Sequence, residues 1–479
     1  MLSTEIDSHC PKDLQSCFKV LYEDDDDYSC ALNIADVVNN CNKSYIMQLL
    51  ERKGETYVLF SRFGRVGQIG QMNTEIFVDK DLAIKEFCDM FYEKTGVIWS
   101  NRYNDQGSIK SGKYQFILMK RDNMRTVAEQ TEQVDESVTL ANSVQRFIKL
   151  IYDPTLYGGA GESFGFDTKK LPLGSLGLAQ IQKASKIISD IGKLIDAETG
   201  EVKKGKESAV NTLSSLFYTS VPSAQSRLKP LNTLGQLEEK GDLLDLLRNM
   251  SYMSKNVDKG VMEKYHKLET ALTHVDDSAT MMMIDKYLKT NAGSTHNFAL
   301  KILDMYKIDK PKETQAYRKW DGLHNKQLLW HGTRLANAVG ILTTGLRINP
   351  TGVPTTGKMF GNGLYFANAS TKSAGYMGLN GKGQGLLFLC EVALGNMYER
   401  LQAENINSLP DGRHSTKGVG IWQPDPEQHI EIDDVTVPIG RLKQGSVSNK
   451  ALQYDEFIVY DASQIKMRYV LVVEYDSKW

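Results

Sequence analysis

The sequence contains no long apolar run and no amino-terminal segment of the basic-then-apolar kind. No stretch of its 479 residues reaches the ~18 uninterrupted apolar residues that a membrane-spanning helix requires. We therefore expect no membrane partner and a location in the cytosol or nucleus. Charged residues make up 24% and apolar residues 41% of the chain, which is ordinary for a globular protein.

Cysteine is scarce, and no two cysteines form a CxxC pair. The chain has six of them, which in a reducing compartment are expected to be free thiols. His9, Cys10 and Cys17 stand close together in the sequence, but the other half of a four-ligand zinc site is missing. We expect no metal.

Three common signatures of nucleotide and metal enzymes are also missing. No GxxxxGK[ST] phosphate loop occurs, and the GxG starts at Gly159, Gly361 and Gly383 lack the final glycine of GxGxxG. A dinucleotide-binding Rossmann fold is therefore not expected. No histidine pair at helical spacing encloses an acidic residue, which argues against a metalloprotease-type site.

Charge is unevenly distributed, although the net charge is only -2. Residues 1–42 hold nine acidic and two basic residues, and residues 43–121 hold thirteen basic and nine acidic residues. A mildly basic module behind an acidic tail is compatible with a phosphate-bearing partner, although most such imbalances are solvated surface. Residues 1–20 show no periodicity, and we predict a disordered acidic tail there.

The pattern of apolar residues divides the remaining chain. Strand-like runs at 45–50, 56–60 and 114–119, with one amphipathic helix between 81 and 95, predict a small α+β module over 21–121. A polar linker is expected over 122–137. Helical spacing at 144–151, 181–195 and 243–250 predicts an all-α bundle over 138–256. Strand-like runs separated by glycines predict a mixed domain over 257–479.

The segment LLWHGTR ends an apolar run in His331, followed at once by Gly332. An isolated histidine at such a place is most often a core histidine satisfied by backbone groups. Glycine, however, lets a ligand approach the backbone. Two further segments favour a pocket: GNGLYFANASTKSAGYM, with Tyr365 in a short strand, and YDEFIVYD, in which Asp455 and Glu456 begin an apolar strand.

In this order and spacing, LLWHGTR, GNGLYFA, KSAGYM, EVALGNMYE and YDEFIVYD closely resemble the catalytic domain of the poly(ADP-ribose) polymerases. LPLGSLGLAQIQKA and LFYTSVP resemble that family's helical regulatory domain. YIMQLLERKGETYVLFSRFGRVGQIGQ, FYEKTGVIWSNR and GKYQFILM resemble its WGR domain. The resemblance covers roughly residues 21–479. It implies a multidomain α+β protein: a small α+β WGR module, an all-α regulatory bundle, and a mixed α/β ADP-ribosyltransferase domain with antiparallel-rich sheets.

The resemblance also implies that NAD+ is the substrate and assigns roles at its nicotinamide end. The backbone of Gly332 would pair with the carboxamide, joined by the hydroxyl of Ser373. Tyr376 would stack on the nicotinamide ring, and Tyr365 would cover its other side.

Other residues would serve the riboses and the acceptor. Glu456 would bind the 2′-hydroxyl of the nicotinamide ribose, stabilise the developing cation and orient or deprotonate the acceptor hydroxyl. His331 would bond a hydroxyl of the adenine ribose, and Lys372 would lie near the acceptor and pyrophosphate. Three residues would line the adenosine end: Thr333, Asn337 and Arg347.

Two positions depart from the family pattern. Phe63 stands where the WGR signature has tryptophan; its ring would still stack at a DNA end but has no indole N–H donor. Arg65 would still meet a phosphate bidentately. Lys358 stands in a loop bordering the pocket, where many members have an aromatic residue.

By this resemblance, the expected function is that of the short DNA-dependent members: DNA-break-activated ADP-ribosyl transfer that makes poly(ADP-ribose) on the protein itself and on other proteins in DNA damage repair. Its expected partners are DNA breaks carrying a 5′-phosphate and acceptor proteins, including the enzyme itself, and its expected location is the nucleus. Three alternatives stay open: transfer of single units, a transferase not gated by DNA, and a catalytically inactive DNA-end scaffold. The last requires a broken catalytic set, yet His331, Tyr365 and Glu456 are all present.

Overall fold

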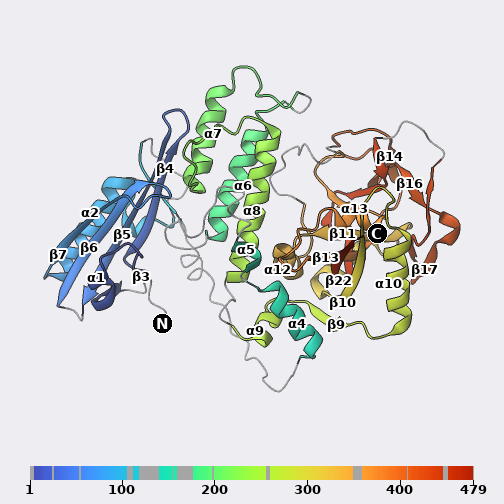
Figure 1. Cartoon of the computed structure of the whole chain (residues 1–479). Helices are drawn as coiled ribbons and strands as arrows, with labels where there is room; N and C mark the ends of the chain where they lie inside the picture. The colour runs from blue at the N-terminus through green and yellow to red at the C-terminus, as the bar shows by residue number, and fades with distance from the viewer. Residues whose placement is uncertain are drawn as a thin grey trace. The chain divides into compact units, whose positions relative to one another are not determined.

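A computed structural model of the chain separates into two compact units, each formed from two segments of the sequence (Figure 1). The first comprises Met1–Gln130 and Gly158–Ser251, and the second comprises Thr131–Tyr157 and Tyr252–Trp479. The multidomain architecture expected from the sequence is confirmed. The structure describes residues 5–23, 26–52, 55–104, 112–117, 140–153, 155–158, 176–196, 199–254, 259–348, 359–406, 408–445 and 451–477. The expected linker over 122–137 and Lys358 lie outside these residues.

The first unit contains an antiparallel sheet with one long helix, α2 (Lys80–Thr95), on its face. Asp79 caps the helix by accepting from the amide of Leu82, and Phe87 and Phe91 are fully buried beneath it. The small α+β module expected from the sequence is confirmed, although β4 and β7 were not predicted. The sheet order is β7 (Gln71–Phe77), β6 (Thr56–Arg65), β5 (Cys41–Arg52), β4 (Ser29–Asp36) and β8 (Gln115–Phe116), with β1 (Lys19–Val20) also pairing with β5.

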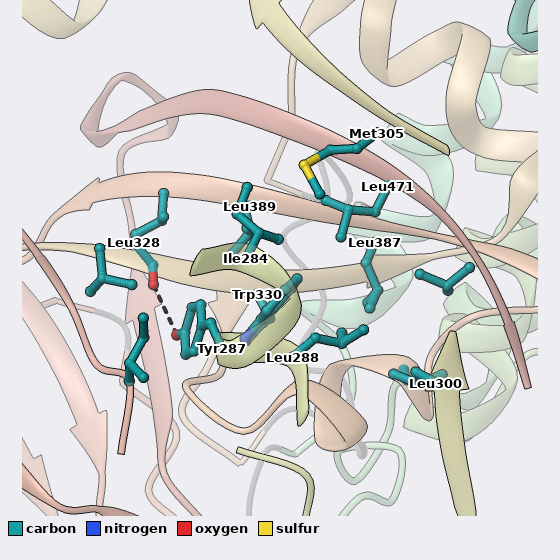
Figure 2. Packing of buried hydrophobic residues seen from close by; sticks show 14 of the residues in the cluster. Ile284, Tyr287, Leu288, Leu300, Met305, Leu328, Trp330, Leu387, Leu389 and Leu471 are labelled. Carbon is teal, nitrogen blue, oxygen red and sulfur yellow. Dashed lines mark hydrogen bonds between the residues drawn. The ribbon is translucent and has the colours of Figure 1, made fainter. Parts of the chain in front are cut away.

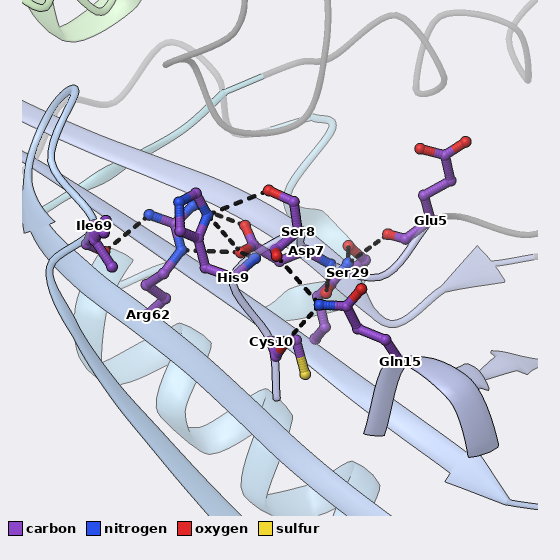
Figure 3. A network of polar contacts seen from close by, with 10 residues as sticks. Glu5, Asp7, Ser8, His9, Cys10, Gln15, Ser29, Arg62 and Ile69 are labelled. Carbon is purple, nitrogen blue, oxygen red and sulfur yellow. Dashed lines mark hydrogen bonds and ion pairs between the residues drawn. The ribbon is translucent and has the colours of Figure 1, made fainter. Parts of the chain in front are cut away.

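Residues 5–20, predicted to be disordered, form an ordered segment that includes α1 (Lys12–Cys17). Asp7 accepts two hydrogen bonds from the guanidinium of Arg62, at 3.0 and 2.8 Å, and both side chains are buried (Figure 3). The segment also packs against an apolar cluster of β5 and β6 through three side chains: Ile6, Leu14 and Phe18. The prediction failed because single residues at irregular spacing make these contacts, so no periodicity marks them. The remaining short elements nearby are β2 (Tyr22–Glu23), β3 (Asp26–Asp27) and η1 (Trp99–Asn101).

Within the described part of the first unit, three helices of the helical region run alongside one another (Figure 1). They are α6 (Leu178–Gly192), α7 (Glu207–Ser220) and α8 (Leu234–Ser254). The amide of Ala35 in β4 donates to the hydroxyl of Thr219 in α7 at 2.9 Å, and the amide of Val37 donates to Ser215 at 3.0 Å. Backbone amides at the end of β4 are therefore hydrogen-bonded to hydroxyl side chains of α7.

The expected helix over 144–151 is present as α4 (Asn142–Ile151) but lies in the second unit. Phe147 packs on Tyr306 with ring centroids 4.7 Å apart, and the Tyr306 hydroxyl donates to the carbonyl of Ser143 at 2.8 Å. The apolar spacing identified the buried face of α4, but it carried no information on the partner. Two short helices of the helical region are α5 (Thr155–Gly158) and α9 (Val261–His266).

The second unit is built on a sheet of seven strands and a sheet of four, with antiparallel pairs in the majority. The first has the order β17 (Ile430–Ile432), β18 (Val435–Val437), β11 (Lys326–Thr333), β13 (Gln384–Ala393), β22 (Ile465–Ser477), β10 (Phe298–Asp309) and β9 (Ala271–His274). The second has the order β12 (Leu364–Phe366), β21 (Glu456–Val459), β15 (Ser415–Gly418) and β14 (Met397–Arg400). A third, smaller sheet contains β19 (Leu442–Gln444), β16 (Gly420–Pro424) and β20 (Leu452–Tyr454).

A buried apolar cluster fixes the end of β11 (Figure 2). The rings of Tyr287 and Trp330 lie 4.8 Å apart, and the Tyr287 hydroxyl donates to the carbonyl of Leu328 at 2.9 Å. Tyr287 comes from α10 (Ser278–Thr290), so this helix holds the strand directly before His331. The other helices of this unit are α11 (Pro311–Tyr317), η3 (Arg318–Trp320), η4 (Leu335–Asn337), α12 (Ala338–Thr344), α13 (Ser370–Ala374), η5 (Pro426–Gln428) and η6 (Ala462–Gln464).

Candidate functional site

The two larger sheets of the second unit meet at Trp330 in β11 and Ala367 after β12. Their backbones exchange hydrogen bonds at 2.8 and 3.0 Å. His331 follows Trp330 on one sheet, and Tyr365 lies near Ala367 on the other. Segments far apart in the sequence thus contribute side chains to one junction.

Gly332 leaves the least room for a side chain at this junction. A Cβ added there would lie 1.8 Å from the carbonyl oxygen of Ser373, so only glycine fits. The hydroxyl of Ser373 donates to the carbonyl of Trp330 at 2.9 Å, which fastens α13 to β11. The structure therefore brings Gly332 and Ser373 together, as the resemblance implies.

His331 and Tyr365 are also adjacent. Nδ1 of His331 lies 3.0 Å from the carbonyl oxygen of Tyr365. Because a carbonyl only accepts, Nδ1 carries the hydrogen of this bond. The Tyr365 hydroxyl donates to the carbonyl of Gly361 at 2.7 Å and accepts from the amide of Phe360 at 3.0 Å. Burial raises the pKa of Tyr365 well above its usual value, so the hydroxyl stays neutral.

Glu456 begins β21 and forms an ion pair with Lys372 of α13. The Lys372 Nζ lies 3.0 Å from Glu456 Oε1 and donates to the carbonyl of Tyr454 at 2.8 Å. Burial lowers the pKa of Lys372, while the charge and hydrogen bond of Glu456 act in the opposite direction. Since Glu456 is only 8% exposed, its carboxylate has little contact with bulk water.

The other expected pocket residues differ in exposure. Tyr376 is 65% exposed, and burial of its hydroxyl, followed by the charge of Glu456, raises its pKa. The side-chain amide of Asn337 donates to the hydroxyl of Thr333 at 3.1 Å. The guanidinium carbon of Arg347 lies 5.9 Å from the ring centroid of Tyr252. Arg347 is thus placed against an aromatic ring of the helical region.

Phe63 and Arg65 lie on β6 of the first unit. The Phe63 ring stacks on Tyr45 with centroids 5.3 Å apart and planes 7° from parallel. The guanidinium of Arg65 donates to the carbonyl and side chain of Asn40, at 3.3 and 3.1 Å, and to the carbonyl of Ser226. Part of the donor capacity of Arg65 is therefore used within the unit.

The residues that surround Asp455 were not predicted. Asp455 is 1% exposed and contacts Lys417, Asn368 and the amide of Gly420. The sequence marked Asp455 through its place before an apolar strand. Lys417 and Asn368 carried no such signal, because single lysines and asparagines at strand ends are common.

Two observations concern metals and membranes. Over the described ranges, no group of three or more histidine, cysteine, aspartate or glutamate side chains could hold a metal ion. Among the helices described, none has the length and apolar character needed to cross a membrane.

Comparison with known proteins finds three family models along the chain. The WGR domain matches residues 28–106, the poly(ADP-ribose) polymerase regulatory domain matches 138–272, and the poly(ADP-ribose) polymerase catalytic domain matches 278–475. The regulatory match extends past the expected boundary at 256 and includes α9.

Curated relatives match over nearly the whole chain. Poly [ADP-ribose] polymerase 1 of Xenopus laevis is 35% identical over 466 residues, which cover 94% of this chain and 46% of the relative. Poly [ADP-ribose] polymerase 2 of Arabidopsis thaliana is 34% identical over 499 residues, which cover 99% of this chain and 77% of the relative. The chain spans about half the length of the type 1 relatives it matches and about three quarters of the type 2 relatives.

Proposed function

Because the chain belongs to the poly(ADP-ribose) polymerase family, we propose that it is an ADP-ribosyltransferase that uses NAD+ as its substrate. Nicotinamide, which is cationic in NAD+, leaves from the anomeric carbon of its ribose, and a nucleophile of the acceptor forms the new bond there. No general acid is needed for this leaving group, unlike in the paired-carboxylate glycosidases. The protein's task is to hold nicotinamide and to stabilise a cationic ribose.

The observation that carries the proposal is the buried Glu456 beside Lys372, at the junction that also holds His331 and Tyr365. A carboxylate screened from water stabilises a developing cation more strongly than one in solvent. The same carboxylate would accept a hydrogen bond from a ribose hydroxyl and orient the acceptor hydroxyl. Lys372 would keep its ion pair with Glu456 and lie beside the pyrophosphate.

The nicotinamide end would be bound by backbone and rings. The amide and carbonyl of Gly332 would pair with the carboxamide, and the lack of a side chain at Gly332 lets Ser373 lie against it. The exposed ring of Tyr376 would stack on nicotinamide, and Tyr365 would cover the other side. His331 would bind a hydroxyl of the adenine ribose.

We further propose that DNA breaks activate the transfer, with acceptors that include the protein itself and with the nucleus as its location. Phe63 and Arg65 would meet a 5′-phosphorylated break through stacking and phosphate contacts, which specify structure and not sequence. The hydrogen bonds of Arg65 to Asn40 and Ser226 favour the alternative of a transferase not gated by DNA, because these bonds occupy donors that a phosphate would need.

Incubation with labelled NAD+, with and without a nicked duplex bearing a 5′-phosphate, separates these possibilities on a denaturing gel. A DNA-dependent ladder supports a break-activated polymerase, and one discrete DNA-dependent band supports single-unit transfer. Equal signal without DNA supports the ungated transferase. Absence of signal under all conditions contradicts the proposed activity.

Glu456→Gln should lower transfer by orders of magnitude. NAD+ should still bind to this variant, and calorimetry measures that binding.

A further inference from the structure

Two adjacent carboxylates at the site each have their own lysine. Glu456 pairs with Lys372 of α13 at 3.0 Å, and Asp455 pairs with Lys417 of β15 at 3.3 Å. The second pair is the more buried at its acidic member, since the Asp455 side chain is 2% exposed and that of Glu456 is 10% exposed. The proposed chemistry uses Glu456 and leaves the Asp455 pair unexplained.

Asp455 is bonded from three separate segments. Its Oδ1 accepts from the amide of Gly420 at 2.8 Å, and its Oδ2 accepts from the side chain of Asn368 at 3.2 Å in addition to its contact with Lys417. Three donors thus satisfy the oxygens of this buried carboxylate. They also hold one residue of the chain between β15, β16 and the segment that follows β12.

The backbone at this point has little freedom. A Cβ added to Gly420 would lie 2.2 Å from the carbonyl carbon of Tyr454 and 2.4 Å from the amide nitrogen of Asp455. Lys372 donates to the carbonyl of Tyr454 at 2.8 Å and to that of Asp455 at 3.4 Å. The backbone just before Glu456 is thus fixed in two ways. The side chain of Asp455 holds it, and so does Lys372, the lysine that pairs with Glu456.

Lys417 lies on the strand that neighbours Glu456. In the β15–β21 register, Gly418 is opposite Glu456 and Lys417 is opposite Phe457. The charge of Glu456 acts on Lys372, Tyr365 and Tyr376, and the charge of Asp455 acts on the same Lys372. Without Lys417, Asp455 would keep its two neutral donors but lose its positive partner, next in sequence to the negative charge of Glu456. Like charges near one another disfavour each other's ionised form.

We propose that Asp455 is a positioning residue that sets the start of β21, and that Lys417 neutralises Asp455 so that Glu456 stays ionised beside Lys372. This inference rests on the proposed role of Glu456. It assigns Lys417 an electrostatic task that a structural lysine would not have.

The test compares pH profiles of kcat/KM for NAD+ in the full chain with nicked DNA present. Lys417→Met keeps the length of the side chain and removes its charge. The acid limb of the profile should move upward by about one pH unit, because a raised pKa of Glu456 removes the carboxylate at higher pH. Adding Asp455→Asn to Lys417→Met removes the unpaired charge, and the limb should return to its original position.

The matched control is Lys443→Met, which breaks an exposed ion pair with Asp425 in the smallest of the three sheets. Its acid limb should not move. Asp455→Ala should lower kcat by about tenfold or more, following the cost of misplacing reacting groups, with little change in KM. Asp455→Asn should recover most of that loss, because an amide oxygen still accepts from Gly420. Thermal melting of each variant identifies those that are unfolded.

Either of two results overturns the inference: an unmoved acid limb in Lys417→Met, or a moved limb that Asp455→Asn does not restore. Glu456→Gln, measured in parallel, separates this failure from that of the proposed function. Full activity of Glu456→Gln removes Glu456 from the chemistry and contradicts both. A large loss in Glu456→Gln with an unmoved limb in Lys417→Met contradicts this inference alone.

Discussion

Tyr376 combines a large aromatic ring with unusual exposure, since 65% of its surface is open to solvent. Removing a ring that is not buried leaves no cavity in the core, so the fold loses little stability. Tyr376→Ala should therefore act on binding: a nicotinamide-mimicking inhibitor should bind about 1–3 kcal/mol less tightly, the value for stacking of a base on an aromatic ring. Calorimetric titration measures the Kd. Tyr376→Phe keeps the ring and should bind normally, and an unchanged Kd in the alanine variant would remove Tyr376 from the pocket.

Residues with a motif around them could be singled out from the sequence as candidates for the site. His331, Gly332 and Ser373 were expected together, and the structure places Ser373 against Gly332. Lys417 and Asn368 were missed because they are marked only by their contacts with Asp455, which is far away in the sequence. Such pairs leave no periodicity and no local signature in a single sequence.

At the scale of elements, Glu313 ties α11 to β22 by accepting from the amide of Met467 at 2.6 Å. Burial raises the pKa of this carboxyl from 4.5 to about 7. Between these two pH values the folded protein thus holds a proton that the unfolded chain releases. The stability that the protonated Glu313 contributes is therefore present below pH 4.5 and lost as the pH rises through 7.

Glu313→Gln should flatten this dependence. A neutral amide resembles the protonated carboxyl, so the variant should lose less stability than the parent between pH 5 and 8, by on the order of 2 kcal/mol. Urea denaturation at several pH values measures the difference. Glu399→Gln, at an exposed position of β14, serves as the control. Parallel curves for the parent and Glu313→Gln would show that Glu313 does not titrate in this range.

The amino-terminal segment depends on one buried ion pair. Asp7 is 6% and Arg62 is 8% exposed. Asp7→Ala leaves the guanidinium of Arg62 buried without its partner, which typically costs about 3–5 kcal/mol. Hydrogen exchange at amides of β5 and β6 should accelerate accordingly. Asp13→Ala, an exposed change on α1, is the control. Unchanged protection in Asp7→Ala would mean that the segment adds no stability to the sheet.

The apolar spacing predicted helices better than it predicted the surfaces on which those helices pack. The spacing of Val144, Phe147 and Ile151 gives the buried face of α4, and all three side chains are buried. That Phe147 packs on Tyr306 of β10 could not be predicted, because an apolar face fits many surfaces. The strand β7 was missed for another reason: it is exposed along most of its length, so it lacks the alternation of a half-buried strand.

At the scale of the whole chain, family boundaries and compact units do not coincide. The regulatory match runs continuously from 138 to 272. The compact units divide that stretch, because Gly158–Ser251 groups with the WGR segment and its two flanks group with the catalytic segment. Sequence similarity follows the order of residues along the chain, whereas a compact unit depends on which residues meet in space.

Arg65 offers a test of DNA gating at this scale. Loss of one phosphate contact should reduce the salt slope of DNA affinity by about 1, and the ratio of DNA-stimulated to DNA-free transfer should fall in Arg65→Ala. Arg52→Ala is the control, because Arg52 belongs to the same sheet and its guanidinium carbon lies 5.4 Å from the ring centroid of Phe18. Fluorescence anisotropy with a 5′-phosphorylated nicked duplex, titrated from low to high salt, measures the slope. An unchanged slope with a lower ratio would assign Arg65 to its bonds with Asn40 and Ser226 rather than to DNA. An unchanged slope and ratio would favour a transferase whose WGR domain does not use Arg65 to sense breaks.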